Sequence, residues 1–443
     1  MIESSWGLLG PEVIGGKRRT RTLGVGASVR NFNDFAVPGL GGVWFAKQLF
    51  LATLGVALAE RVGKAIRPPA RNIETANAVE ALACWFALDS NKWRSDPRVR
   101  GATKMRSRET LAELAFAKVR IPGFYVSQPM RMATVQSLPA LGFVDTEGGR
   151  FSAFSCSQHG RDLIEAEFSG DNDGSSQKSR KLFETLANWT LTSDDPAKSL
   201  KVLSTRASLS KHARNIVAER LAQGSDKEAR HDASRRRAAL DWVESIRDTP
   251  NSALSWKNKP AQIEEAHWRD LQAGALFFST RDTAIRVLDA LESHIGNLTE
   301  RYYSLSAPVP DSVKREMQTL RERAQIFLDE KRSDNIANAF CRECVDERDA
   351  ELLKCLVDRD ARVLVLREDK VVPGPAFKVK TTQNSSGSDE SAAEQVEAPA
   401  QGTIQWPEGI SYRVRNLFLL NADLHGELDK WLGDAPNDET ESE

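Results

Sequence analysis

The chain has 443 residues, a mass of 49.1 kDa and a formal net charge of −1. Hydrophobic residues make up 40% of it and charged residues 28%, so it can bury a core, and its length corresponds to about two or three domains. These values exclude a fibrous protein, a wholly disordered protein and one that coats nucleic acid through uniform positive charge. The five cysteines, an odd number, exclude a disulfide scaffold and favour a reducing compartment.

The first 106 residues combine a glycine-rich, basic segment with two apolar helices. Nine of the 28 glycines lie in residues 1–42. The sequence Gly24-Val-Gly-Ala-Ser lacks the Gly-Lys-Ser/Thr ending of a P-loop, so this segment is predicted to form turns packed on the next helix. Apolar residues at three- and four-residue spacing predict helices over 43–64 and 73–88.

The most apolar stretch, residues 43–62, is predicted to be a buried helix and not a membrane span. Lys47, Glu60 and Arg61 leave only residues 48–59 free of charge. A helix of this length rises about 18 Å, which is short of the roughly 30 Å hydrocarbon core of a bilayer. We therefore expect a cytoplasmic protein with no membrane partner.

Residues 107–168 have the predicted order helix, helix, β-hairpin, helix. Ser107 and Ser157 are suited to cap the first and last helices. Between them, Leu141-Gly-Phe-Val and Phe151-Ser-Ala-Phe-Ser predict two strands joined by a turn at Gly148-Gly149. This order resembles a winged helix-turn-helix domain, which implies a domain over 107–170 that contacts nucleic acid or protein. The sequence departs from that pattern at Pro139, late in the expected recognition helix.

The rest of the chain divides into a helical domain, a small α+β region and an acidic tail. Helical periodicity predicts a domain over 178–360, with Asp311 capping one of its helices. Within 361–432, a strand at 361–368 turns into Val371-Val372, a segment at 381–402 without apolar anchors is predicted to be a disordered insertion, and 424–432 is predicted to form a final short helix. Residues 433–443 form the acidic tail. We expect a mainly α, multi-helix fold with an embedded winged helix and a small C-terminal β-containing region.

The near-zero net charge conceals an uneven distribution. Residues 381–443 carry 13 acids and 3 bases, a net charge of −10, so the preceding residues carry about +9. Within 198–237 there are 11 Lys or Arg against 4 acids, and residues 94–108 hold 6 bases against 1 acid. Such segments can attract phosphates in a salt-dependent way. They can also simply form the solvated faces of helices.

No pattern of residues predicts catalysis, a metal or a cofactor. Cys341-Arg-Glu-Cys344 and Cys355 offer fewer than the four ligands that a structural zinc requires, and we expect them to be small buried residues on an apolar helix face. The six histidines are widely spaced and form no HxxxH or HExxH motif. We therefore assign no catalytic, cofactor-binding or metal-binding residue.

Together these features predict a non-enzymatic, nucleic-acid-associated subunit of a multi-protein bacterial-type assembly, such as a defence, plasmid-maintenance or chromosome-organising system. Its expected partners are DNA or RNA and other protein subunits. The contacts are expected to be mainly to phosphates. The candidate residues are Arg131 and Gln136 of the recognition helix, Arg150 of the wing, and Arg235, Arg236 and Arg237 of a distal helix.

Two alternatives stay open. One is a protein scaffold, because the order of winged helix, helical middle and acidic linker resembles that of kleisin-type subunits of condensin complexes. The C-terminus, however, does not resemble the second winged helix of such subunits. The other alternative is an enzyme whose site is assembled across domains.

Overall fold

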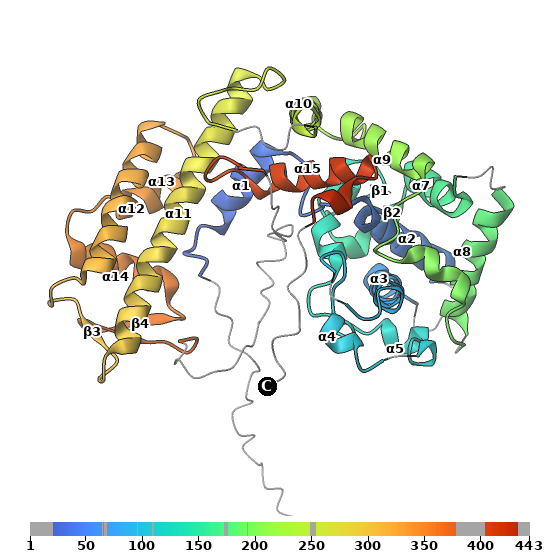
Figure 1. Ribbon diagram of the computed structural model, residues 1–443, viewed down its shortest axis with the longest axis horizontal. Helices are drawn as coiled ribbons and strands as arrows, with labels where there is room; N and C mark the ends of the chain where they lie inside the picture. The colour runs from blue at the N-terminus through green and yellow to red at the C-terminus, as the bar shows by residue number, and fades with distance from the viewer. Residues whose placement is uncertain are drawn as a thin grey trace, which may run out of the picture. The chain divides into compact units, whose positions relative to one another are not determined.

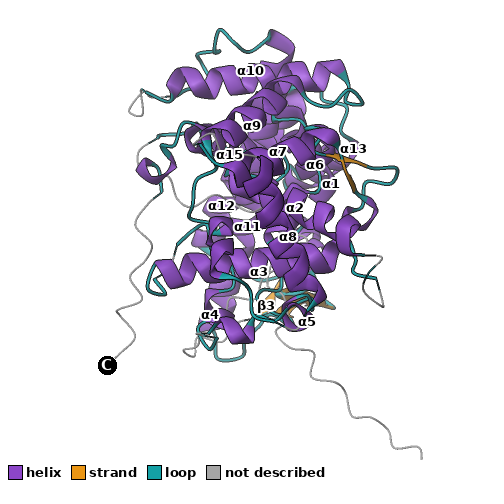
Figure 2. Ribbon diagram, turned by 90° about the vertical axis from the view of Figure 1, so that its right-hand side faces the viewer, coloured by secondary structure: helices purple, strands orange, loops and turns teal. Residues whose placement is uncertain are grey.

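The structure is a computed structural model that describes residues 21–63, 65, 69–94, 96–108, 110–171, 176–192, 194–248, 254–377 and 404–432. These residues form a mainly helical fold with two small antiparallel sheets (Figure 2), which confirms the predicted class. They fold as two compact units. The large unit contains the described residues of 27–278 and 404–432, and the small unit contains 21–26 and 279–377. The expected insertion at 381–402 and the acidic tail at 433–443 lie outside the described residues.

The large unit has a hydrophobic core that runs across the domain intervals expected from the sequence. Side chains from 36–88, from 105–271 and from 404–431 all belong to it. The interval 107–170 therefore shares its core with the helices on either side of it in sequence. Local periodicity reveals which residues are apolar, but it does not reveal which distant segments bury them together.

Two helices that are buried almost along their whole lengths lie at the centre of the large unit. They are α2 (Ala46–Val62) and α3 (Asn72–Ser90), as the sequence predicts. Gly55 allows their close approach, since a Cβ there would lie 2.6 Å from the Cα of Ala76. Thr75 Oγ1 donates a hydrogen bond to the Gly55 carbonyl at 2.7 Å. A helix that is apolar on all sides must be covered on all sides, and the other elements supply that cover.

No helix in the described ranges is long and apolar enough to cross a bilayer. The buried position of α2 agrees with the prediction that residues 43–62 form a core helix. The charged residue at its start, Lys47, is itself buried and paired with an acid. The apolar stretch is therefore accounted for by packing within the protein.

The first turn of α2 is capped by its own residue Gln48 and by an acid distant in sequence, because Phe45 at the N-cap position has no polar side chain. Gln48 Oε1 accepts hydrogen bonds from the backbone N–H groups of Trp44 (2.9 Å) and Phe45 (3.3 Å). Asp423, on the C-terminal helix α15 (Tyr412–Leu424), accepts from Ala46 N at 2.8 Å. A carboxylate at a helix N-terminus also opposes the positive end of the helix dipole. The C-terminal segment is thus bound directly to the central helix.

The other elements of the large unit are mostly short before residue 158 and longer after it. Those before it are α1 (Gly26–Ala36), α4 (Ala102–Met105), η1 (Leu111–Glu113), α5 (Phe116–Val119), η2 (Met130–Thr134), α6 (Ser137–Ala140), β1 (Val144–Asp145), η3 (Phe151–Ala153) and β2 (Ser155–Cys156). Those after it are α7 (Gln158–Ser169), α8 (Ser176–Leu191), η4 (Lys198–Leu203), α9 (Lys211–Gln223), α10 (Arg230–Ile246), the start of α11 (Glu265–Asn297) and η6 (Leu428–Lys430).

The interval that resembles a winged helix contains an antiparallel strand pair and the predicted final helix. Three of its predicted features are wrong: residues 151–153 form η3 and not a strand, no continuous helix follows Ser107, and the expected recognition helix is replaced by the short η2 and α6. Strand β1 pairs antiparallel with β2, and Ser157 Oγ accepts from Gly160 N to cap α7. No helix starts at Ser107. Instead, Trp85 Nε1 donates a hydrogen bond to the Arg108 carbonyl at 2.7 Å, and the Arg108 guanidinium lies 3.8 Å from the centre of the Phe124 ring. The assignment to the winged-helix family stays a prediction.

The small unit packs helices beside a three-stranded sheet (Figure 1). Its helices are the later part of α11, α12 (Asp311–Asp329), α13 (Asn335–Cys344) and α14 (Asp349–Asp360). The sheet has the order β3-β5-β4, formed by Tyr303–Ser304, Lys370–Pro373 and Leu364–Arg367. Its β4–β5 hairpin confirms the predicted strand and turn. Buried Arg21 is fixed in this unit by ion pairs to Asp289, to Glu292 at 2.9 Å and to Asp360 at 3.2 Å.

Two predicted helix boundaries are wrong. Asp311 is the first residue of α12, while Pro310 occupies the cap position. The C-terminal helix runs over α15 (Tyr412–Leu424) and not over 424–432, where only the short η6 forms. Gly426 lies two residues beyond the end of α15 and adopts a φ of +74°, which is outside the helical range.

Candidate nucleic-acid interface

The structure places the six candidate contact residues in very different environments. Arg236 on α10 is fully buried. Its guanidinium pairs with both oxygens of Glu228, at 2.5 and 2.7 Å, and donates to the carbonyls of Leu221 and Pro38. Its neighbour Arg235 is half-buried in an ion pair of 2.7 Å with Asp270, whereas Arg237 is exposed.

The two candidates of the expected recognition helix are also occupied by other contacts. Arg131 is buried, and its side chain donates to Asn77 Oδ1 on α3. Gln136 Oε1 accepts from Arg413 Nη2 at 2.7 Å. Arg131 and Arg236 are therefore inaccessible to a phosphate in this conformation, and the six residues do not form one surface. Arg150, in the loop of the hairpin, is exposed like Arg237.

Arg131 belongs to a buried polar cluster around Glu80 of α3. The two carboxylate oxygens of Glu80 accept from Tyr125 Oη and from Arg131 N, the latter at 2.7 Å. Burial raises the pKa of Glu80 above its usual value of 4.5, against the lowering effect of Arg131. The folded state therefore binds a proton at Glu80 more readily than the unfolded state does.

This cluster predicts how stability depends on pH. Because the pKa is raised on folding, the contribution of Glu80 is greatest below about pH 4.5 and is lost as pH rises through its folded-state pKa. Glu80→Gln cannot lose a proton, so its stability does not fall in this way. The difference between its melting temperature and that of the wild type should therefore increase as pH rises from about 4.5 through the folded-state pKa of Glu80. Each tenfold change in the acid dissociation constant corresponds to about 1.4 kcal/mol. Thermal unfolding at several pH values measures this, with Glu165→Gln, at an exposed position of α7, as the control. Parallel curves for Glu80→Gln and wild type would contradict it.

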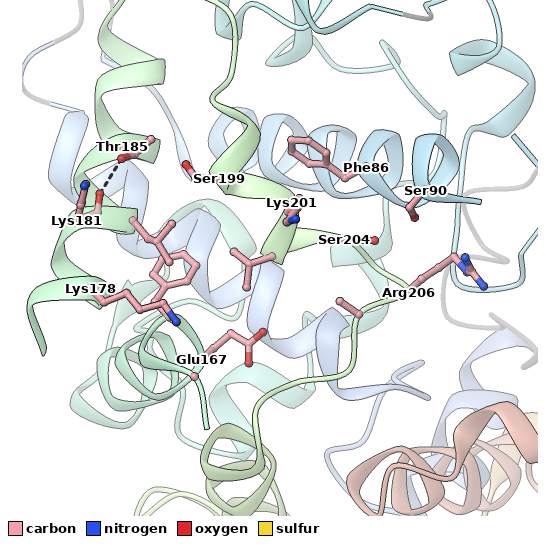
Figure 3. A pocket seen from close by; sticks show the side chains of 15 residues that line it. Phe86, Ser90, Glu167, Lys178, Lys181, Thr185, Ser199, Lys201, Ser204 and Arg206 are labelled. Carbon is pink, nitrogen blue, oxygen red and sulfur yellow. Dashed lines mark hydrogen bonds between the residues drawn. The ribbon is translucent and has the colours of Figure 1, made fainter. Parts of the chain in front are cut away.

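A basic concave surface lies at a pocket of about 850 Å³ in the large unit. Its walls come from α3, α7, α8, η4 and the segment after η4. Most of its inner surface is carbon, contributed by Phe86, Phe168, Leu182, Val202 and Ala207. Four cationic side chains line it as well (Figure 3): Lys178 and Lys181 of α8, Lys201 of η4, and Arg206.

The only acid among the described lining residues is Glu167, at the inner end of α7, and its charge is balanced. Glu167 Oε1 pairs with Lys47 Nζ at 2.6 Å, and its Oε2 accepts from Ser210 N at 2.7 Å. Both side chains of this ion pair are almost fully buried. Lys47 also donates to the Val202 carbonyl at 3.0 Å. Glu167 therefore does not cancel the charge of the four cations, and the pocket is positively charged.

The three lysines of the pocket are exposed and have no ion pair within the described part of the chain. Lys178 Nζ makes one hydrogen bond, of 3.2 Å, to the Ser169 carbonyl. Arg206 differs, because its Nε pairs with Asp96 at 2.8 Å. Burial opposes ionisation of Asp96, but hydrogen bonds from Arg98 and Arg206 lower its pKa, so it stays charged and holds Arg206 in place. Three cations are thus free to reorient toward an anion, and one is fixed.

The cysteines lie where the sequence predicts, on buried helix faces. Cys341 and Cys344 are buried on α13. Burial raises the pKa of Cys341 to about 12 and that of Cys344 well above its usual value, so both are thiols at neutral pH. Within the described ranges, no group of three or more His, Cys, Asp or Glu side chains is arranged to hold a metal ion.

The basic interval 198–237 contains both buried or paired arginines and exposed cations, which the sequence alone does not distinguish. The arginines at its C-terminal end are paired or buried, except Arg237, whereas Lys201 near its start faces the pocket. A usable signal is the spacing of Lys178 and Lys181, three residues apart on one helix, which places both side chains on one face. No family model, no curated protein and no solved structure matches this chain.

Proposed function

We propose that this protein is a non-enzymatic subunit that binds nucleic acid through the basic pocket formed by Lys178, Lys181, Lys201 and Arg206. One observation carries the proposal: four cations line one concave surface, and the acid among its described lining residues, Glu167, is neutralised by a buried lysine. When such cations contact the phosphates of a nucleic acid, they displace condensed counterions, and this release favours binding and makes it dependent on salt. Membership of a defence, plasmid-maintenance or chromosome-organising assembly is part of the same proposal.

The arrangement favours contacts to the nucleic-acid backbone over recognition of base sequence. Lysine is a flexible point charge, and it lacks the planar fork with which arginine reads guanine. Three of the four cations are lysines without a fixed partner, and the arginine is engaged by Asp96. We expect binding to vary little with sequence.

The test is the salt dependence of binding to a labelled oligonucleotide, followed by fluorescence anisotropy at about 50 and 200 mM salt. The triple variant Lys178→Ala/Lys181→Ala/Lys201→Ala should weaken binding about a hundredfold at the lower salt. It should also reduce the slope of log K against log salt by about 2 to 3, because each lost phosphate contact contributes roughly 0.7 to 0.9. The variant should fold normally, since all three side chains are exposed.

A matched control removes the same charge at other exposed positions. Lys118, Lys257 and Lys314 are exposed, and their side chains have no hydrogen bond or ion pair with any other described residue. Lys118→Ala/Lys257→Ala/Lys314→Ala should keep most of the affinity and of the salt slope. Equal losses in the two triple variants would mean that overall charge, and not the pocket, governs binding. Absence of binding by the wild type, with partner subunits supplied, would favour the scaffold alternative.

A further inference from the structure

We propose that the basic pocket accepts one unpaired nucleotide, with its base against the apolar interior and its phosphate at the cations of the rim. This inference rests on the proposed function and names the ligand more closely. It predicts a preference for single-stranded over double-stranded nucleic acid.

The size and lining of the pocket suit a base and not only a phosphate. Its volume of about 850 Å³ lies within the usual range for pockets that enclose small ligands. A site for phosphate alone needs cations and backbone N–H groups, but this interior is lined by Phe86, Phe168 and Leu182, from three different helices. Phe86 and Phe168 are buried within the wall, so the surface that a base would meet is mainly the aliphatic surface of Leu182, Val202 and Ala207. Apolar surface of this kind can cover the face of a base.

The interior is held rigidly, so the pocket is formed before any ligand arrives. Phe168 is almost fully buried and packs edge-on against Phe50 of α2, with ring centres 5.7 Å apart. The Lys47–Glu167 ion pair joins α2 to α7 beside it. A ligand therefore does not have to order the apolar surface on binding, and less of the interaction free energy is lost.

The charges are placed where a nucleotide carries its own. Lys178 and Lys181 project from α8, while Lys201 and Arg206 lie on η4 and just after it (Figure 3). Ser199 of η4 is exposed in the same lining and offers a hydroxyl group that can donate or accept. A nucleotide whose base lies inside the pocket would thus have cations on more than one side of its sugar and phosphate.

A double helix cannot use this pocket without giving up a base pair. The bases of a duplex are stacked and expose only their edges in the grooves, so a duplex can contact the rim through its phosphates but cannot place the face of a base in the interior. Extruding a base costs unstacking and unpairing free energy, which a single strand does not have to supply. Single strands should therefore gain the interior contacts that duplexes forgo.

The experiment compares a labelled single strand of about 16 nucleotides with its duplex, by anisotropy at low salt. Wild type should bind the single strand about tenfold or more tightly than the duplex. Ala207→Trp fills the pocket without removing a cation, so it should lower single-strand affinity to the duplex value and leave duplex affinity unchanged. Ser199→Trp, at the exposed rim, is the second variant if Ala207→Trp does not fold. Ala117→Trp, at an exposed position of α5, is the control and should change neither affinity.

Competition experiments distinguish the two possible sources of such a nucleotide, which are a nucleic-acid strand and a free mononucleotide. Adenosine monophosphate should displace the single strand from the wild type at lower concentration than inorganic phosphate does. Equal affinity of the wild type for single strand and duplex, or unchanged single-strand affinity in the folded tryptophan variants, would overturn this inference while leaving the proposed function standing. Direct binding of adenosine monophosphate without binding of any oligonucleotide would support the pocket assignment and overturn the proposed function. Absence of binding of the single strand, the duplex and adenosine monophosphate would overturn both.

Discussion

Lys47→Met is expected to lower the free energy of unfolding by about 3 to 5 kcal/mol, because it leaves Glu167 buried without its counter-ion. Methionine can fill the volume of the lysine stem but cannot donate to Glu167 or to the Val202 carbonyl, which Lys47 contacts at 2.6 and 3.0 Å. Glu167 would keep only the hydrogen bond from Ser210 N. Urea unfolding followed by circular dichroism measures the loss.

Two controls distinguish a buried charge from charge in general. The double variant Lys47→Met/Glu167→Gln should recover most of the stability, since glutamine is neutral and can still accept from Ser210 N. Arg61→Ala breaks the exposed pair between Arg61 and Glu184, and it should cost less than about 1 kcal/mol. A single variant Lys47→Met as stable as Arg61→Ala would contradict the buried pairing.

The same substitution should also affect the pocket. In folded Lys47→Met, any charge that Glu167 retains is no longer balanced by Lys47 and lies among the cations that line the pocket. Affinity for nucleic acid should therefore fall further in Lys47→Met than in Lys47→Met/Glu167→Gln. The order of these two variants connects the central ion pair of the large unit to the proposed function.

The parts of the fold that the sequence predicts well are those set by short-range patterns. Helices α2 and α3, the β4–β5 hairpin and the Ser157 cap of α7 all depend on residues within a few positions of one another. The first helix expected after Ser107 is replaced by the short η1 and α5, and Arg108 instead contacts Trp85 and Phe124 through tertiary interactions that local patterns do not indicate. The cap of α2 likewise depends on Asp423, 377 residues away, which no local pattern indicates.

The candidate site was harder to predict, because charge in a sequence does not reveal which charges are paired. The arginine run 235–237 has the strongest local positive charge of its region, yet two of its members face acids. Lys178 and Lys181 lie in the short run Lys178-Ser-Arg-Lys181, outside the basic interval 198–237, and Lys201 stands alone between Leu200 and Val202. A count of charge along the sequence therefore does not bring the three lysines together. Their common position follows from the packing of α8 and η4 against α3 and α7, which is tertiary information.

Arg236→Ala is expected to destabilise the protein by about 3 to 5 kcal/mol, whereas Arg237→Ala should change stability by less than about 0.5 kcal/mol. Arg236 is fully buried and makes a two-pronged ion pair with Glu228, while Arg237, the next residue, is exposed. Gly224 makes room for this pair, since a Cβ at that position would overlap the Glu228 carboxylate. Removing Arg236 leaves Glu228 unpaired and the carbonyls of Leu221 and Pro38 without a donor.

The two variants carry the same substitution and the same change of charge at adjacent positions, so each is the control for the other. Urea unfolding gives the free energies, and anisotropy at low salt gives the affinities. Arg237→Ala should remain folded and show whether this exposed face of α10 contributes to binding. A triple alanine variant of 235–237 would confuse the two effects, because loss of binding could follow from loss of folding at Arg236. Equal stability of Arg236→Ala and Arg237→Ala would contradict the burial of Arg236 and return it to the set of candidate phosphate contacts.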